Sequence, residues 1–265
     1  MAAHTPDTGE DVAPGARHYR AFVGATQTYD TFSHMQFSLM TLLGLRQEHT
    51  LLDIGCGSLR GGKLFIMYLL PDRYFGIEPE QWLVEEGIDR EIGREVIERK
   101  RPRFWFDRDF TCTAFGTQFD FLLAQSIFSH ASIAQIRRCL SQTRAVMKPS
   151  SIFASSFVEG DSDYDGDAWV YPGTIPYRAA TIERLASEAG LSCKRVEWFH
   201  AGGQTWFLFF VPGLEPEIDQ LASLNQVVPI KEEMKHYRMR SDRLARIESH
   251  PLFRLASRIL RVVRR

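Results

Sequence analysis

The sequence lacks the marks of several common protein classes. Its four cysteines, Cys56, Cys112, Cys139 and Cys193, lie far apart without a C-x-x-C pair, which argues against a zinc site or a disulfide framework. No stretch reaches the about 18 apolar residues of a membrane-spanning helix. The net charge is −1, so the chain has no overall basic footprint for nucleic acid. We therefore expect a cytoplasmic protein that binds no nucleic acid.

The composition otherwise fits a globular protein. Hydrophobic residues make up 44% of the chain, enough to fill the core of one large domain or two small ones. Residues 1–16 are polar, contain Pro and Gly, and lack the apolar stretch of a signal peptide. We expect a disordered leader there.

Residues 51–62 are the most informative stretch, reading Leu-Leu-Asp-Ile-Gly-Cys-Gly-Ser-Leu-Arg-Gly-Gly. The pattern predicts a buried strand that ends in a Gly-rich turn and a helix N-terminus, where free N–H groups and Gly backbone suit a nucleotide-type cofactor. A dinucleotide fingerprint would need its third glycine one residue before Gly61. A nicotinamide oxidoreductase is therefore the disfavoured alternative.

A second strand is predicted over residues 73–79, and it ends in an acid. Glu78 follows Gly57 by about 20 residues. At this spacing, dinucleotide-binding folds place a carboxylate that binds the ribose. Its oxygens suit hydrogen bonds from both ribose hydroxyls. The alternative is a solvated acid at a strand end.

The rest of the chain alternates strands and helices. Apolar runs predict strands over 103–107, 119–125 and 151–158, and helical spacing predicts helices over 131–147 and 181–189. Strands over 192–200 and 205–211, joined by Ala-Gly-Gly-Gln, predict a hairpin. The fold class is α/β: a Rossmann-like, mostly parallel sheet flanked by helices and ending in an antiparallel β-hairpin.

Two helical regions flank this sheet. Residues 17–46 predict an N-terminal helical cap, with a plain surface helix as the alternative. Residues 214–265 predict a C-terminal basic helical tail, because positions 231–265 hold eleven Lys or Arg and four Asp or Glu with amphipathic spacing. This tail suits packing on the domain or in a homo-oligomer, or peripheral membrane contact.

These motifs in this order resemble the class I S-adenosylmethionine-dependent methyltransferases. Motif I of that family has the form apolar-Asp-apolar-Gly-x-Gly, which residues 52–57 match, and the likeness extends over residues 35–212. It implies that residues 47–213 bind S-adenosyl-L-methionine. The implied cofactor-binding residues are Asp53, Gly55, Cys56, Gly57, Arg60, Gly61, Glu78, Asp109, Phe110, Gln125, Ser126 and Gln36.

For the adenine amino group, the resemblance implies an acid after the third strand. Asp109 is the first choice and Asp107 the second. The alternative for Asp109 is a surface ion pair with Arg108. Phe110 is placed to cover the adenine face, or else to fill the core.

The fourth strand leads into Gln-Ser-Ile-Phe-Ser-His, residues 125–130. The Asn- or Asp-Pro-Pro motif of nucleobase and glutamine N-methylation is absent, and so is the Pro-Cys of cytosine methylation. His130 is instead the candidate catalytic base, because a neutral imidazole can take the proton of an attacking hydroxyl. The alternative is a histidine bonded to backbone at a helix start.

An acidic and aromatic loop follows the fifth strand, and together with the hairpin tip it predicts the acceptor site. The candidate substrate-binding residues are Glu159, Tyr164, Trp169, Tyr177, His200 and Gln204. Asp161, Asp163 and Asp165 begin like an EF-hand loop, but Pro172 stands where the bidentate Glu belongs. A Mg²⁺ site that orients a sugar or diol stays an option, and a solvated loop is the alternative.

The combined interpretation is an O-methyltransferase that acts on a small molecule, with a sugar or oligosaccharide as the favoured acceptor. The strings at 55–62, 125–130 and 204–206 resemble bacterial methyltransferases of polysaccharide or glycolipid synthesis, including the mycobacterial methylmannose polysaccharide 1-O-methyltransferases. Two alternatives stay open. One is N-methylation of an amine metabolite or peptide, and the other is a nonenzymatic cofactor-binding module recruited by its basic tail.

Overall fold

A computed structural model describes residues 8–9, 11–214 and 216 of the chain. Most of the basic tail expected over 214–265, and with it the expected membrane or subunit contact, lies outside these residues, as do residues 1–7 of the leader. The described residues contain no helix that is long and apolar enough to cross a membrane.

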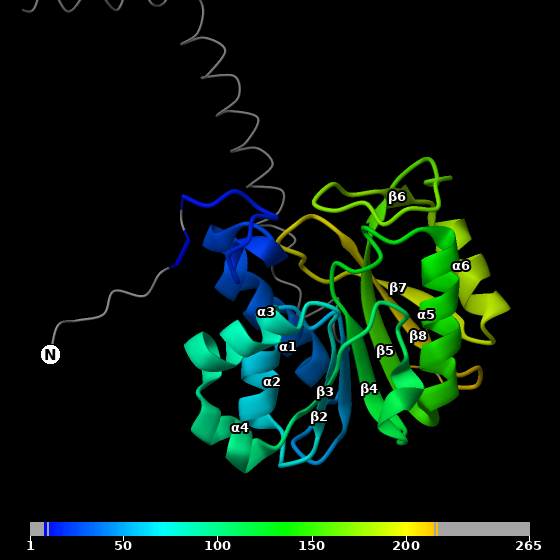
Figure 1. The fold of residues 1–265 in the computed structure, drawn as a ribbon. Helices are drawn as coiled ribbons and strands as arrows, with labels where there is room; N and C mark the ends of the chain where they lie inside the picture. The colour runs from blue at the N-terminus through cyan, green and yellow to red at the C-terminus, as the bar shows by residue number, and fades with distance from the viewer. Residues whose placement is uncertain (1–7, 10, 215, 217–265) are drawn as a thin grey trace, which may run out of the picture. The chain divides into compact units, whose positions relative to one another are not determined.

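One sheet organises the domain, with strand order β3-β2-β1-β4-β5-β8-β7 (Figure 1). β1 to β5 are parallel, and β8 runs antiparallel to both β5 and β7. A short strand β6 pairs with the end of β5. The strands are β1 (Leu51–Ile54), β2 (Tyr74–Ile77), β3 (Arg103–Trp105), β4 (Phe119–Ala124), β5 (Met147–Glu159), β6 (Pro176–Tyr177), β7 (Ser192–Val196) and β8 (Thr205–Phe210). The predicted parallel sheet with a final antiparallel hairpin is confirmed.

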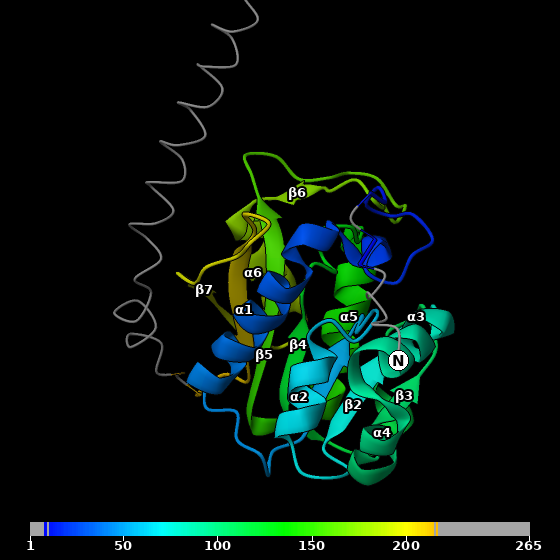
Figure 2. The ribbon, with the colours of Figure 1, turned by 90° about the vertical axis from the view of Figure 1, so that its left-hand side faces the viewer.

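Helices cover both faces of the sheet (Figures 1 and 2). Helices α1 to α4 lie on one face, and α5 and α6 lie on the other. The α-helices are α1 (Tyr29–Leu42), α2 (Gly62–Tyr68), α3 (Gln81–Gly87), α4 (Arg94–Lys100), α5 (Ile133–Val146) and α6 (Ala179–Glu188). Short 3₁₀ helices span Ala21–Val23, Thr26–Thr28 and Cys112–Phe115, and a π-helical turn spans Ile88–Ile92.

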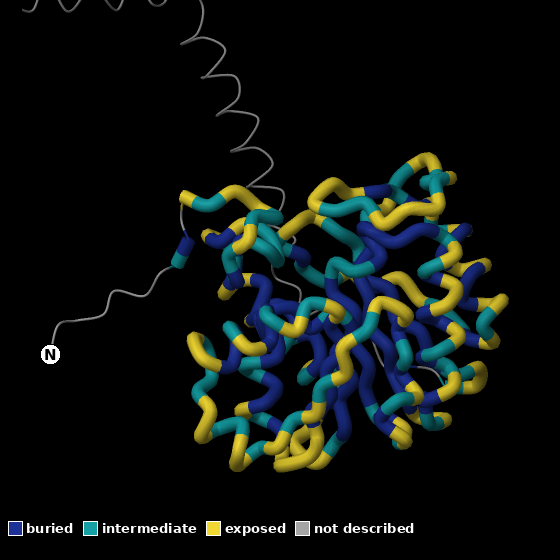
Figure 3. The backbone as a smooth tube through the Cα atoms, in the orientation of Figure 1, coloured by how far each residue is buried: buried dark blue, intermediate teal, exposed yellow. Residues whose placement is uncertain are grey.

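The core follows from the alternation of side chains along buried strands. Leu51 packs with α1 and α2, whereas Leu52 and Ile54 pack with α5 and α6, so each face has its own apolar cluster. Figure 3 shows the middle of the sheet buried. At the start of α5 a capping box fixes the helix: Gln135 N–H donates to Ser132 Oγ, and Ser132 N–H donates to Gln135 Oε1.

Two predicted elements differ from the structure. The region 17–46 is not one helix, because Gly24 takes φ = 127° and separates a 3₁₀ turn from α1. The strand predicted to reach His200 ends at Val196. The backbone beyond it leaves the sheet, and His200 Nδ1 accepts the N–H groups of Gly202 and Gln204 at 3.1 and 3.2 Å, which stabilises a turn in place of strand pairing.

Candidate active site

A cavity of about 520 Å³ lies at the carboxyl ends of β1, β2 and β4. The sheet order reverses between β1 and β4, and such a switch point is where open α/β sheets bind ligands. The volume falls in the range of small-molecule sites. All the cofactor residues expected from the sequence line this cavity except Asp109.

The turn after β1 packs too closely for side chains. At Gly55, with φ = 70°, a Cβ would lie 2.1 Å from Ile127 Cδ1. Gly61 has an ordinary helical backbone, but a Cβ there would lie 2.6 Å from Gln36 Oε1. The late glycine of the motif thus makes room for α1, which brings Gln36 to the cavity.

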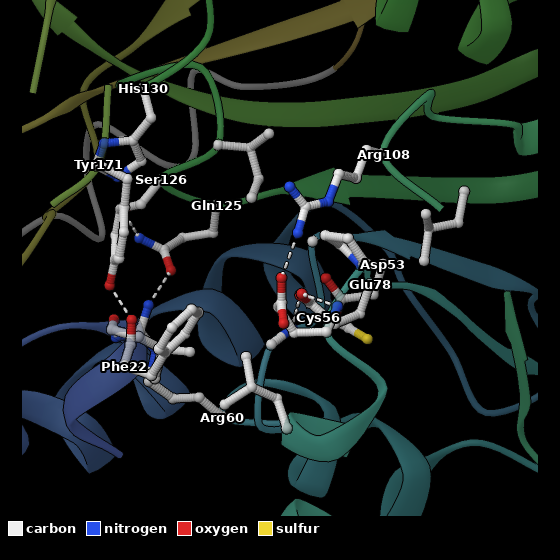
Figure 4. Close-up of a pocket in the computed structure, with 18 of the residues that line it drawn as sticks. Phe22, Asp53, Cys56, Arg60, Glu78, Arg108, Gln125, Ser126, His130 and Tyr171 are labelled. Atoms are coloured by element: carbon white, nitrogen blue, oxygen red, sulfur yellow. Dashed lines mark hydrogen bonds and ion pairs between the residues drawn. The ribbon is translucent and has the colours of Figure 1, made fainter. Parts of the chain in front are cut away.

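Asp53 and Glu78 are buried carboxyl groups at the ends of neighbouring strands (Figure 4). Tyr74 Oη donates to Asp53 Oδ2 at 2.7 Å, and burial raises the pKa of Asp53 to about 6. Glu78 Oε2 accepts Gly57 N–H at 2.9 Å and Oε1 accepts Glu80 N–H at 3.0 Å. Burial raises the pKa of Glu78 to about 7. Because an ionised carboxylate accepts about four hydrogen bonds, Glu78 retains capacity for a ligand.

The acid after β3 that lines the cavity is Asp107, the second choice from the sequence. Asp109 lies outside, 68% exposed and ion-paired with Arg138 rather than Arg108. Asp107 Oδ2 accepts Trp105 Nε1–H at 2.7 Å, and Phe110 lines the cavity with φ = 56°. A bulky residue in this left-handed conformation is uncommon and marks local strain at the cavity wall.

Arg60 is a buried cation at the opposite end of the cavity from Glu78 (Figure 4). Its Nη1 donates to Val23 O and its Nη2 donates to Gln125 Oε1, both at 2.7 Å. The guanidinium lies 4.4 Å from the Phe32 ring centroid. Burial lowers its pKa to about 10, so it stays charged at neutral pH. No carboxylate of the described chain is ion-paired with it, which leaves its charge for an anionic ligand group.

His130 lines the same end and is held by backbone. Its Nδ1 lies 3.0 Å from Val170 O and 2.7 Å from Gly173 O. Carbonyl oxygens only accept, so Nδ1 carries the proton and Nε2 keeps its lone pair. Burial lowers the pKa of His130, which keeps the imidazole neutral at pH 7. The ring is bonded to backbone, as the alternative from the sequence had it, and it also lines the cavity; its role as a base stays a prediction.

The expected substrate residues divide into two groups. Trp169 lines the cavity and is 42% exposed. The other five do not line it: Glu159 pairs with Arg195 at 3.0 Å, Tyr177 Oη donates to Ala131 O at 2.8 Å, and Tyr164 packs against the core.

His200 and Gln204 lie behind the cavity wall rather than in it. His200 Nε2 lies 3.2 Å from Gln125 Nε2, and Gln204 Nε2 donates to Ser126 Oγ at 2.9 Å. Ser156 Oγ donates to Gln204 Oε1 at 2.7 Å and accepts Ser126 N–H at 2.8 Å. The hairpin tip therefore supports Gln125 and Ser126, the two residues that follow β4.

The acidic loop holds no metal cluster: the described residues contain no group of three or more His, Cys, Asp or Glu placed to bind an ion. Asp163 uses both oxygens at the start of α6, accepting Arg178 N–H and Thr181 Oγ1–H at 2.8 Å each. Asp163 is thus tied to the start of α6, and the Mg²⁺ site offered for this loop is not supported among the described residues.

Phe22, Val23 and Tyr171 are cavity residues that the expected set of site residues did not include. Phe22 and Val23 line the cavity from the N-terminal region, and Tyr171 lines it from the loop after β5. Only the concentration of aromatic residues in these two regions signalled them, because neither carries a motif.

No family model matches the chain, and no curated protein matches it in sequence. Solved structures do resemble it. The magnesium protoporphyrin IX methyltransferase ChlM from Synechocystis PCC 6803, with bound SAH, has a TM-score of 0.51 and 14% identity over 71% of this chain and 87% of that chain. The glycopeptide N-methyltransferase MtfA, with bound S-adenosyl-L-homocysteine, has a TM-score of 0.52 and 16% identity over 69% and 90%.

A third structure, an S-adenosylmethionine-dependent methyltransferase from Clostridium acetobutylicum ATCC 824, has a TM-score of 0.50 and 11% identity over 70% of this chain and 92% of that chain. At these identities the similarity defines the fold. The chain has the Rossmann-like α/β fold of S-adenosylmethionine-dependent methyltransferases, as the sequence motifs predicted.

Proposed function

We propose that this protein is an S-adenosyl-L-methionine-dependent methyltransferase that methylates a hydroxyl group. One observation carries the proposal: a single cavity at the switch point joins Glu78 and the glycine turn to a neutral His130 whose Nε2 keeps its lone pair. Glu78 and the glycine turn suit the binding of a nucleoside, and His130 suits the role of proton acceptor.

The cofactor fits the cavity by chemistry at three points. Glu78 would accept the ribose hydroxyls, and Asp107 with Phe110 would hold the adenine. Arg60, with Gln36 and Gln125 beside it, would bind the carboxylate of the methionine end. The bound cofactor supplies an electrophilic methyl group on a sulfonium.

His130 supports an oxygen acceptor in particular. A hydroxyl must lose its proton as it attacks carbon, and Nε2 takes that proton while Nδ1 stays bonded to the loop carbonyls. An unprotonated amine needs no such base. Alignment of the acceptor oxygen with the methyl group supplies the larger part of the rate.

The favoured acceptor is a sugar or oligosaccharide. Trp169 and Tyr171 pack against His130, Phe22 packs on Tyr171, and all three uncharged rings line the cavity. Aromatic faces suit the C–H faces of a neutral sugar ring, and Trp169 is exposed enough to meet a ligand from solvent.

Calorimetry and labelling test this function. We expect S-adenosyl-L-homocysteine to bind and NAD not to bind. We also expect labelled methyl groups to enter a neutral glycan fraction, with the same rate in EDTA. Binding of NAD alone would overturn the proposal. Label in an amine or peptide fraction would replace the hydroxyl acceptor with a nitrogen one, and cofactor binding without any transfer would favour the nonenzymatic module.

A further inference from the structure

The loop from Trp169 to Ile175 is tied along its length to the segment that carries His130. Val170 N–H donates to His130 O and Ile175 N–H donates to Ser129 O, both at 2.9 Å. The loop carbonyls of Val170 and Gly173 also accept the proton at His130 Nδ1. The orientation of the imidazole thus depends on this loop.

Tyr171 projects from the loop and connects it to the N-terminal region (Figure 4). Its ring meets the His130 imidazole edge-on, with centroids 5.0 Å apart and planes at 83°. Its hydroxyl donates to the carbonyl oxygen of Phe22. The Tyr171 ring is therefore fixed at both ends, by the loop and by Phe22.

Phe22 continues this contact toward the other side of the cavity. Its ring packs on Tyr171 at 5.7 Å and on Trp82 of α3 at 5.3 Å. The next carbonyl, that of Val23, accepts Arg60 Nη1–H. One short segment is thus held by the proposed methionine-binding arginine on one side and by Tyr171 on the other.

The groups in direct contact with the imidazole are uncharged. Its contacts are the carbonyls of Val170 and Gly173 and the rings of Trp169 and Tyr171. Tyr171 is the titratable group among them, and burial raises its pKa, so its hydroxyl stays protonated and able to donate.

We propose, building on the function above, that Tyr171 is a positioning residue. Its ring holds the His130 imidazole, and its hydroxyl holds the Phe22 segment. Tyr171 thereby sets the distance between His130 and Phe22 to fit an uncharged, ring-shaped acceptor. A general base must lie within about 3 Å of the oxygen it deprotonates. A displacement of about 1 Å in such a site costs on the order of 10²-fold in rate. Tyr171 controls this geometry without accepting the proton itself.

Two variants separate the two roles, and Tyr68→Phe on α2, away from the cavity, is the matched control. Tyr171→Phe keeps the ring and removes the bond to Phe22. We expect hydrogen exchange of residues 20–24 to accelerate severalfold, and the acceptor KM to rise about tenfold. The affinity for S-adenosyl-L-homocysteine should stay within about twofold of wild type, and the NMR titration of His130 should not move.

Tyr171→Leu also removes the ring against the imidazole and admits water. We expect the pKa of His130, followed by NMR in the S-adenosyl-L-homocysteine complex, to rise toward its ordinary value, and kcat to fall about 10²-fold. Unchanged exchange in Tyr171→Phe, or an unchanged His130 titration in a folded Tyr171→Leu, would overturn the proposal. A wild-type protein that binds no S-adenosyl-L-homocysteine would instead refute the proposed function.

Discussion

The carboxylate of Glu78, at the end of β2, accepts the backbone N–H of Gly57, in the turn after β1, at 2.9 Å. This bond joins the two motifs from which the sequence predicts a cofactor site. It also places an acid with spare acceptor capacity beside the glycine turn that lines the cavity.

Glu78→Gln should weaken binding of S-adenosyl-L-homocysteine by about 10- to 100-fold. The amide keeps the shape of the side chain but loses the charge-assisted hydrogen bonds to the ribose, worth about 1.5–3 kcal/mol. Calorimetry measures the change. Glu98→Gln, an exposed substitution on α4, is the control and should have no effect. Equal affinities of the two variants would remove Glu78 from the cofactor site.

Binding of S-adenosyl-L-homocysteine should also depend on pH, and the pKa of Glu78 should set the pH range over which the affinity changes. Its pKa of about 7 means that the free protein must lose a proton to bind below that pH. Affinity should therefore be constant above pH 7 and should fall by up to about tenfold per unit below it. The dependence should disappear in Glu78→Gln, and persistence there would assign it to another group.

The stability of the unliganded protein should change with pH in the opposite direction, because it should fall as the pH rises. Burial raises the Glu78 pKa from its ordinary 4.5 to about 7, so in this window the folded state keeps a proton that the unfolded chain loses. Stability should fall by roughly 3 kcal/mol between these pH values and level off above. Urea unfolding at several pH values, compared with Glu78→Gln, isolates this contribution.

Arg60→Met should weaken contacts to the methionine end of the cofactor and leave those to the nucleoside end unchanged. S-adenosyl-L-homocysteine should lose about 10- to 100-fold in affinity, since a charge-assisted contact to its carboxylate is worth about 1.5–3 kcal/mol. Methylthioadenosine lacks that carboxylate and should bind within about threefold of wild type. An equal loss for both ligands would show that the variant disturbs the whole cavity.

Removal of the proposed base should affect turnover and not binding. His130→Ala should lower kcat for a hydroxyl acceptor by about 10²–10⁴-fold, the usual contribution of a general base. Affinity for S-adenosyl-L-homocysteine should stay near wild type. His34→Ala, at an exposed position of α1, is the control. Full activity of His130→Ala would favour an amine acceptor.

Much of the fold was predictable because the sheet is buried on both faces. Continuous apolar runs such as residues 119–125 signal such strands, and the turn after β1 has a motif. The choice between Asp107 and Asp109 was not predictable, because both follow a three-residue strand at the sheet edge. Only the turn at Asp107, whose Oδ1 accepts Asp109 N–H, determines which side chain faces the cavity.

The residues at the proposed acceptor end of the cavity could not be predicted from the sequence for a different reason. Phe22 and Tyr171 lie 149 positions apart and meet only in the folded chain. Neither belongs to a regular element with a periodic signal, so local sequence patterns carry no information about their contact. Conversely His200 and Gln204, polar residues in a turn, suggested a ligand site but support the strand ends from behind.

The order of the strands also governs how the domain is completed during synthesis. β8 lies between β5 and β7, so the last strand among the described residues to leave the ribosome is an inner strand of the sheet. Until Thr205–Phe210 arrives, β5 has an open edge and β7 has no partner. Folding of the sheet therefore waits for contacts between distant parts of the chain, and a product that stops before residue 205 is exposed to aggregation through the β5 edge.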